Sequence, residues 1–462
     1  MKSRLMKLWE DLRSSYWFVP TLMALVAVGL SVLMVEGDRM WGVDWLEGVP
    51  WLSANKPAGA RELLSTIAGS MITVAGVTFS ITIAAVAYAA SQFGPRLLTN
   101  FMRDRGNQVT LGTFIATFIY CLLVLRSIRE GDGEELFVPH AAILLGLLLT
   151  MMSVAVLIYF IHHVPESIHA SNVVAALGRE LDALIAARHP TLAASAVLMP
   201  RALGSPPALP EAFYRQAAPV LCKTDGYVQY LDEDALLRLA TEGDLLVRIE
   251  HRPGDFVRRG RALLLAWPPE NLHGELAHEL AGSFAIGERR TPRQDILFLA
   301  QELVEIATRA LSPMINDPFT ATACMERLAC GMSRLAEREV REAALADEEG
   351  NLRLLTRPTT LAVFAERTLG RLRPYVQKDR NAAIELMRVL GELTESLRRP
   401  DQRALLRHHA KQLHRGAMAA LDEDSARVVD ERFRVVLRLL DDPDAWHEIA
   451  ACCEWLSGRE AA

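Results

Sequence analysis

Histidines gather where a long apolar segment ends. His162, Glu166 and His169 are spaced i, i+4 and i+7, so a helix would place two imidazoles and a carboxylate on one face. Such a face could bind a metal ion or change its charge near neutral pH. Pro165 interrupts the face and no further strong ligand lies nearby, so we expect no metal here. The histidines are interpreted as a membrane-interface anchor, with pH sensing by His162, His163 and His169 as the alternative.

A second candidate set is a stripe of small and hydroxylated residues. Five of them recur at steps of three and four, on one face of a helix: Thr66, Gly69, Thr73, Gly76 and Ser80. Small residues let helices approach closely in lipid, so packing alone explains the stripe. Hydroxyls and exposed backbone can also replace part of an ion's hydration shell, so the stripe equally fits a pore wall. Both interpretations stay open, and Gln92 and Arg96 would form a ring at the inner mouth of such a pore.

The third candidate set is a proline-rich polar corner. Ser312 before Pro313 is typical of a helix N-cap with proline at the first helical position. Asn316, Asp317 and Pro318 are typical of a turn that starts a helix. We interpret the segment as a rigid corner between helices. The alternative is a polar contact surface at a subunit junction or a ligand cleft.

The histidines and the stripe lie on or beside segments without Asp, Glu, Lys or Arg, and there are four such segments. They are residues 14–35, 63–95, 106–125 and 136–165, and each can cross a hydrocarbon core of ~30 Å, which takes about 20 helical residues. We predict transmembrane helices at about 16–35, 63–92, 107–126 and 137–162, within a membrane domain of residues 1–165. The first is expected to remain as a helix, because its apolar stretch exceeds that of a cleaved signal peptide.

The distribution of basic residues predicts the orientation of these helices. Residues 1–13 carry four Lys or Arg and residues 96–105 carry three, whereas the two other connections carry five that are spread among many acids. By the positive-inside rule, the first group lies in the cytoplasm. Both termini are then expected to be cytoplasmic.

Composition excludes several classes of protein. Apolar residues make up 51% and charged residues 23%, which excludes a disordered, collagen-like or disulfide-scaffold chain. The net charge of −6 belongs wholly to the residues after 165, where 38 basic residues face 44 acidic ones, and this argues against nucleic acid. The six cysteines include no C-x-x-C pair. We find no motif of a nucleotide-binding, zinc-protease or hydrolase site, so we assign no catalytic residue and no cofactor.

The remainder of the chain changes pattern twice. A helix to about Arg188 and a proline-rich linker fill residues 166–210, and residues 211–268 carry short apolar runs typical of strands. The run from Gly254 to Gly260 resembles the GD-x-V-x-x-G edge of biotinyl and lipoyl hammerhead folds. Lys223 does not sit in the hairpin that such carriers modify, so we expect a purely structural β-rich, hammerhead-like module. Residues 286–462 show helical periodicity, so the fold class is mainly α.

Several of these motifs together resemble one known family. They are the segments 70–80, 90–96, 101–105, 160–163 and 310–321, the last reading ALSPMINDPFTA. The chain resembles a bacterial family of predicted inner-membrane proteins of unknown function. Gly94 and Met314 stand where we expect serine and alanine. The resemblance implies four spans, a cytosolic domain and an inner-membrane location, and it implies no activity.

The leading functional hypothesis is a homo-oligomeric channel with a cytosolic gate or vestibule. Thr66, Thr73 and Ser80 would face the path, Gly69 and Gly76 would permit close packing, and anions would be favoured by Arg96. The expected partners are the lipid bilayer, further copies of the chain and inorganic ions. The rival hypothesis is a membrane-anchored scaffold or sensor that recruits a cytosolic partner. A membrane enzyme is the third candidate.

Overall fold

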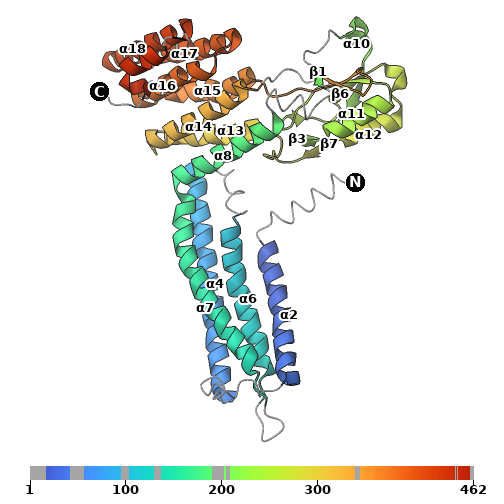
Figure 1. Ribbon diagram of the computed structural model, residues 1–462, viewed down its shortest axis with the longest axis vertical. Helices are drawn as coiled ribbons and strands as arrows, with labels where there is room; N and C mark the ends of the chain where they lie inside the picture. Colours follow the sequence, from blue (N-terminus) through green and yellow to red (C-terminus); the bar gives the residue numbers. More distant parts are fainter. Residues whose placement is uncertain are drawn as a thin grey trace. The chain divides into compact units, whose positions relative to one another are not determined.

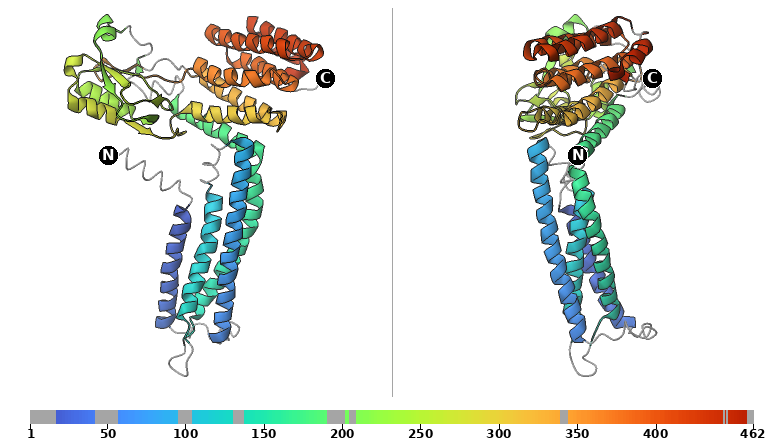
Figure 2. Two further views of the ribbon diagram at one scale, coloured as in Figure 1. Left: turned by 180° about the vertical axis from the view of Figure 1, so that it is seen from behind. Right: turned by 90° about the vertical axis from the view of Figure 1, so that its left-hand side faces the viewer.

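The chain divides into two compact units, Met1–Asn172 and Val173–Ala462. The computed structural model describes residues 17–41, 57–94, 104–129, 137–189, 202–203, 209–338, 344–442, 444 and 446–457. Figures 1 and 2 trace the elements in chain order by colour. Most of the predicted proline-rich linker between 189 and 210 lies outside the described residues.

The first unit is a bundle of four long helices (Figure 1). They are α2 (Phe18–Trp41), α4 (Pro57–Phe93), α6 (Arg105–Ser127) and α7 (His140–Ile168). Each is long and apolar enough to cross a membrane, which confirms the four predicted spans. The helix α6 packs against each of the other three. Leu64, Phe114, Tyr120 and Ile143 are fully buried in the core between the helices.

Two of these helices extend beyond the apolar segments that predicted them. The helix α2 continues past residue 35 because its charged end has partners within the unit. The carboxylate of Asp38 accepts hydrogen bonds from the backbone N–H groups of Ala141 and Ala142, at 3.2 and 3.0 Å. These are donors that the start of α7 would otherwise leave unsatisfied. The helix α4 runs unbroken for 37 residues, or roughly 55 Å at ~1.5 Å per residue.

The second unit begins with a β-rich region. Its strands are β1 (Ala202–Leu203), β2 (Ala218–Leu221), β3 (Gly226–Leu231), β4 (Leu246–Ile249), β5 (Phe256–Val257), β6 (Ala262–Trp267), β7 (Phe284–Gly287), β8 (Ala344–Ala346) and β9 (Leu352–Leu355). Six form a sheet in the order β1-β8-β9-β4-β6-β2, and three form a sheet in the order β5-β3-β7. All strand pairs are antiparallel except β4 with β9. The helices α10 (Glu211–Gln216), α11 (Glu233–Glu242) and α12 (Gly274–Gly282) and the short 3₁₀ helix η4 (Pro269–Asn271) connect strands.

The strands β8 and β9 come from the segment between two helices of the later, helical region. Leu354 of β9 is fully buried and belongs to the same apolar core as Val247 of β4 and Leu264 of β6. The β-rich region therefore closes with a hairpin that follows its first strands by well over a hundred residues in the sequence.

The rest of the second unit is helical, in agreement with the predicted fold class. Its helices are α8 (Ala170–Arg188), α13 (Ile296–Ala310), α14 (Pro318–Ala336), α15 (Leu361–Val376), α16 (Arg380–Ser396), α17 (Pro400–Ala420), α18 (Glu423–Asp441), α19 (Trp446–Cys452) and α20 (Glu454–Ser457). Figure 2 shows α13 to α18 stacked in layers. The helix α8 packs on α14, since the methyl groups of Leu181 and Ile185 lie against Gly331.

Candidate functional site

The polar stripe of α4 points away from the four-helix bundle. All five of its residues are exposed in the first unit: Thr66, Gly69, Thr73, Gly76 and Ser80. The opposite face carries larger apolar residues such as Leu64, Ile67 and Met71, which are buried against the other helices. The helical repeat thus places the small and hydroxylated residues on the outward side of α4, where exposed apolar residues such as Ile72 and Val77 also lie. The five residues predicted from spacing are brought together on one surface, and no residue that the structure describes covers it.

The glycines of the stripe pack against none of the residues that the structure describes. A Cβ atom added at Gly69 or Gly76 would meet no atom within 4 Å. In contrast, a Cβ added at Gly112 of α6 would come within 2.5 Å of the Met23 sulfur, and one added at Gly146 of α7 would lie 3.5 Å from Leu64. Glycine at 112 therefore permits close packing of α2 on α6. The open space at the α4 glycines is available to a neighbour outside the chain or to solvent.

The hydroxyl groups of the stripe donate to their own helix. Thr73 Oγ1 donates to the Gly69 carbonyl at 2.8 Å, and Ser80 Oγ donates to the Gly76 carbonyl at 2.9 Å. Ser70, beside the stripe, donates to the Thr66 carbonyl at 2.7 Å. Each hydroxyl oxygen keeps lone pairs that can still accept. The outward face therefore presents acceptor oxygens whose own protons are already engaged, which suits water or a cation.

A second polar stripe, on α6, was not anticipated from the sequence. Its members are buried inside the bundle: Asn107, Gln108, Thr110, Thr113 and Thr117. Thr117 Oγ1 lies 3.0 Å from Ser153 Oγ of α7. Because Ser153 donates its proton to the Leu149 carbonyl, Thr117 is the donor in this contact. The spacing of α6 carries the signal, but spacing alone does not distinguish an inward stripe from an outward one.

The end of α7 forms a polar contact with the start of α6. His163 Nε2 lies 2.6 Å from Asp104 Oδ2, and Asp104 also caps α6 by accepting from the Gly106 N–H at 3.0 Å. The Tyr159 ring stacks on the imidazole, with centroids 5.0 Å apart. A Cβ at Gly106 would lie 2.7 Å from His163 Nε2, so glycine allows this approach. Sequence reasoning missed Asp104 because it precedes His163 by 59 positions.

The histidine face proposed from i, i+4 and i+7 spacing is not formed. The helix α7 ends at Ile168, and His169 has extended backbone angles, so it leaves the face of His162 and Glu166. The Nδ1 atom of His169 contacts Ser171 Oγ at 2.8 Å, and the His162 side chain is exposed. Among the described residues, no group of three or more His, Cys, Asp or Glu side chains is arranged to hold a metal ion.

Of the two residues predicted at the inner mouth, the structure describes one. Gln92 lies in the last turn of α4 and is half-buried. Arg96 lies outside the described residues.

The proline-rich corner differs in part from the prediction. Asp317 caps α14 by accepting from the Thr320 N–H at 3.1 Å, with Pro318 as the first helical residue. Asn316 has a φ of 48°, which suits an asparagine in a turn. The N-cap predicted for Ser312 was wrong, because the chain after Pro313 forms a turn in which the Ser312 carbonyl accepts from the N–H groups at 315 and 316. Turns over residues 311–315, rather than a new helix, join α13 to Asn316.

Large apolar side chains project from this corner. Met314 is 94% exposed and Phe319 is 86% exposed. The corner is thus an exposed apolar point, in addition to the polar corner that the sequence predicted.

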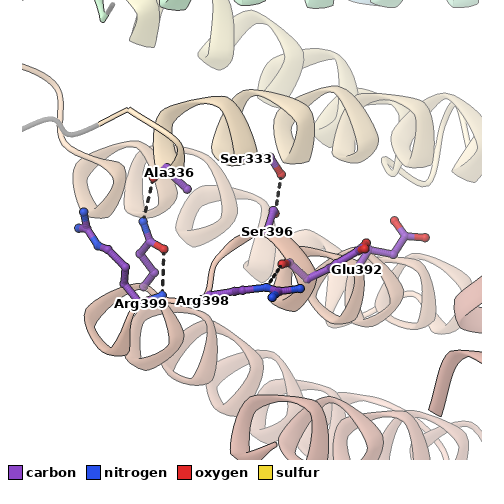
Figure 3. Close-up of a pocket in the computed structure, with 8 residues that line it drawn as sticks. Ser333, Ala336, Glu392, Ser396, Arg398 and Arg399 are labelled. Atoms are coloured by element: carbon purple, nitrogen blue, oxygen red, sulfur yellow. Dashed lines mark hydrogen bonds between the residues drawn. The ribbon is translucent and has the colours of Figure 1, made fainter. Parts of the chain in front are cut away.

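Sequence reasoning also missed a cavity of about 590 Å³ between α14, α16 and α17. Figure 3 shows its polar lining. Ser333 Oγ and Ser396 Oγ lie 2.9 Å apart, and the Gln402 side chain donates to the Ala336 carbonyl at 3.1 Å. Burial raises the pKa of the Glu392 carboxyl, and the positive charge of Arg388 opposes this rise. Glu392 is paired with Arg388 and Arg399 with Asp401, so these charges already have partners and we assign the cavity no chemistry.

Comparisons with known proteins agree with the membrane assignment. The sequence model of a family described as "Predicted membrane protein (DUF2254)" matches residues 13–392. Uncharacterized proteins of Mycobacterium bovis and Mycobacterium tuberculosis are each 28% identical over 437 residues, which is 93% of this chain and 81% of the relative. A further uncharacterized protein of Mycobacterium tuberculosis is 27% identical over the same length. No solved structure matches the chain.

Proposed function

Since the chain belongs to the DUF2254 family of predicted membrane proteins, we propose that it forms a homo-oligomeric channel in a bacterial inner membrane. In this proposal, α4 helices from several copies surround a polar path. Thr66, Thr73 and Ser80 face that path, and Gly69 and Gly76 allow neighbouring α4 helices to approach. The observation that carries the proposal is the polar stripe of α4, which faces outward and is covered by none of the described residues.

A lipid environment makes this face notable. Helices in a bilayer gain little from the hydrophobic effect, and their contacts depend on close van der Waals packing and on polar groups. The four-helix bundle satisfies these needs on its inner side, where Gly112 and the Thr117–Ser153 contact lie. The α4 face carries the same residue types, and none of the described parts of the chain packs on it. Assembly of several copies would give it one.

The position of the stripe defines what can pass. Its acceptor oxygens favour water and cations, whereas the predicted ring of Arg96 at the inner mouth favours anions. We propose that both termini are cytoplasmic and that the second unit forms the gate or vestibule. The pH-sensing role of the histidines remains a prediction. Among the described residues, His163 is the one of the three that contacts a carboxylate, that of Asp104.

Flux through purified protein in liposomes tests the proposal. Potassium and chloride gradients are applied to vesicles that hold the wild-type protein, Gly76→Leu or Gly29→Leu. Both glycines are exposed on spans and have no atom within 4 Å of an added Cβ, but Gly29 lies on α2, outside the stripe. We expect flux from the wild type and from Gly29→Leu, and loss of flux from Gly76→Leu.

Two results would contradict a channel whose path runs along the α4 stripe. One is the absence of flux from correctly assembled wild-type protein at several pH values and membrane tensions. The other is equal flux from all three proteins. A dimer in detergent together with absent flux would favour the scaffold hypothesis, because two α4 helices form a seam and do not surround a path.

A further inference from the structure

The β-rich region ends in a compact tip formed by two loops. The loop between β2 and β3 and the turn between β5 and β6 are held together by backbone hydrogen bonds. Gly260 N–H donates to the Cys222 carbonyl and Cys222 N–H donates to the Arg261 carbonyl, each at 2.8 Å. Arg259 N–H donates to the Asp225 carboxylate, also at 2.8 Å. We call residues 221–225 and 256–261 the basic tip.

Four cationic side chains are exposed on the basic tip: Lys223, Arg258, Arg259 and Arg261. Asp225 is its one acidic residue. Among the described residues none of the four cations forms an ion pair with a carboxylate, and Lys223 Nζ contacts His278 Nδ1 at 2.8 Å. Other arginines of the same region are paired, as Arg248 is with Glu250 at 2.7 Å.

Apolar side chains project beside these cations. Phe256 is 52% exposed and Leu221 is 49% exposed. The Phe256 ring meets the Tyr227 ring edge to face, with centroids 5.0 Å apart, and the two residues are paired across β5 and β3. The next residue, Val257, is buried, so strand alternation fixes Phe256 on the outer side.

The motif that resembles a hammerhead edge explains how the tip is built. Its constant positions are structural: Gly254 has a φ of 94° and a Cβ there would lie 2.0 Å from the Asp295 carboxylate, and Gly260 has a φ of 81°. Val257 fills the core. The variable positions between them carry Phe256, Arg258 and Arg259, which are exposed. The turn therefore holds two arginines and an aromatic ring on its exposed side.

We propose that the basic tip docks on the anionic surface of a lipid bilayer. Clustered Lys and Arg are attracted to anionic headgroups, and neighbouring apolar side chains insert at the headgroup boundary. The charge of the tip is opposite in sign to the net charge of −6 of the whole chain. The four spans already tether the second unit to a bilayer. The effective concentration of the bilayer surface near the tip is therefore high. The inference depends on the spans and not on channel activity.

Photocrosslinking of the full chain in nanodiscs tests this docking. Phe256→p-benzoylphenylalanine is compared with Tyr375→p-benzoylphenylalanine, because Tyr375 of α15 is 51% exposed and matches Phe256. The discs contain either phosphatidylcholine alone or phosphatidylcholine with phosphatidylglycerol. Lipid adducts are read from the intact mass after illumination. We expect an adduct yield at position 256 about tenfold higher in the anionic discs than in the neutral ones, and a low yield at position 375 in both.

Charge-reversed variants separate the tip from other surfaces. Arg258→Glu with Arg259→Glu should remove the gain in anionic discs, and so should high salt, which screens charges. Lys411→Glu with Arg415→Glu is the control, since both residues are exposed on α17, a helix that packs against α15, α16 and α18. This control should leave the gain unchanged. Either equal yields in neutral and anionic discs or a gain that survives reversal at 258 and 259 would overturn the proposal. The same crosslinking in cell membranes would overturn it if it gave protein adducts in place of lipid adducts.

Discussion

The helices α4 and α6 carry similar polar residues and use them differently. On α6, Thr110, Thr113 and Thr117 are buried within the bundle, and α6 packs against the three other helices. On α4, Thr73 and Ser80 face outward. A polar stripe in a membrane helix therefore has no fixed structural role. The neighbours of the stripe decide whether it joins helices of one chain or remains available to another molecule.

The glycines give the same lesson in terms of space. Gly112 of α6 is enclosed by Met23 and Pro20 of α2, whereas Gly76 of α4 has an open surrounding. If the comparison is sound, substitutions on α6 should lower the stability of the monomer. Equivalent substitutions on α4 should alter assembly and transport and leave the fold intact.

The largest effect on stability is expected from Gly112→Leu. Overpacking of a close helix contact costs about 1–3 kcal/mol, because the added side chain must displace Met23 or part the α2 and α6 backbones. Gly76→Leu should change the free energy of unfolding by less than about 0.5 kcal/mol. Thermal unfolding of both variants in the same detergent measures the difference. Equal loss of stability in the two variants would break the comparison.

An intermediate effect is expected where α6 begins. Asp104→Ala removes both the N-cap of α6 and the contact with His163, and loss of a cap costs about 0.5–2 kcal/mol. His162→Gln is the matched control at the end of α7, since the His162 side chain is exposed and a surface change of this kind stays within about 0.5 kcal/mol. Denaturation in detergent compares them. A change at His162 as large as that at Asp104 would show that the contact does not hold α6 in place.

The smallest effect is expected from single hydroxyls. Thr117→Val removes the buried hydrogen bond to Ser153, and such bonds between membrane helices contribute about 0.6 kcal/mol on average. Thr73→Val has the same shape but removes a bond to the helix's own backbone on the outward face, so its effect on unfolding should be smaller. Both variants replace threonine by valine, so they differ in where the hydroxyl is lost. The reverse order of effects would argue against the buried position of Thr117.

Much of the fold follows from the sequence through local rules. Four charge-free segments predicted the four helices, and spacing predicted that Thr66 to Ser80 share one face of α4. Helical periodicity also predicted that residues 286–462 are mainly helical, and α13 to α18 lie in that range. These features depend on residues that are close in the sequence, which is why patterns recover them.

The parts that sequence reasoning missed depend on distant residues. His163 meets Asp104 across 59 positions, and the hairpin of β8 and β9 joins a sheet whose other strands mostly precede residue 268. The N-cap at Ser312 was wrong because the corner needs a turn before Asp317 can start α14. Spacing placed the stripe on one face of α4 but could not tell what covers that face.

The accessibility of single cysteines in the assembled protein tests the account most directly. Thr73→Cys, Thr113→Cys and Gly29→Cys are placed separately in a chain whose six native cysteines are replaced by alanine, and the liposomes are treated with a charged, water-soluble thiosulfonate. If a water-filled path runs along α4, the thiol at 73 reacts and its modification reduces flux. The thiols at 113, inside the bundle, and at 29, on the lipid side, should not react. A thiol at 73 that is as unreactive as the other two would contradict a water-filled path along α4.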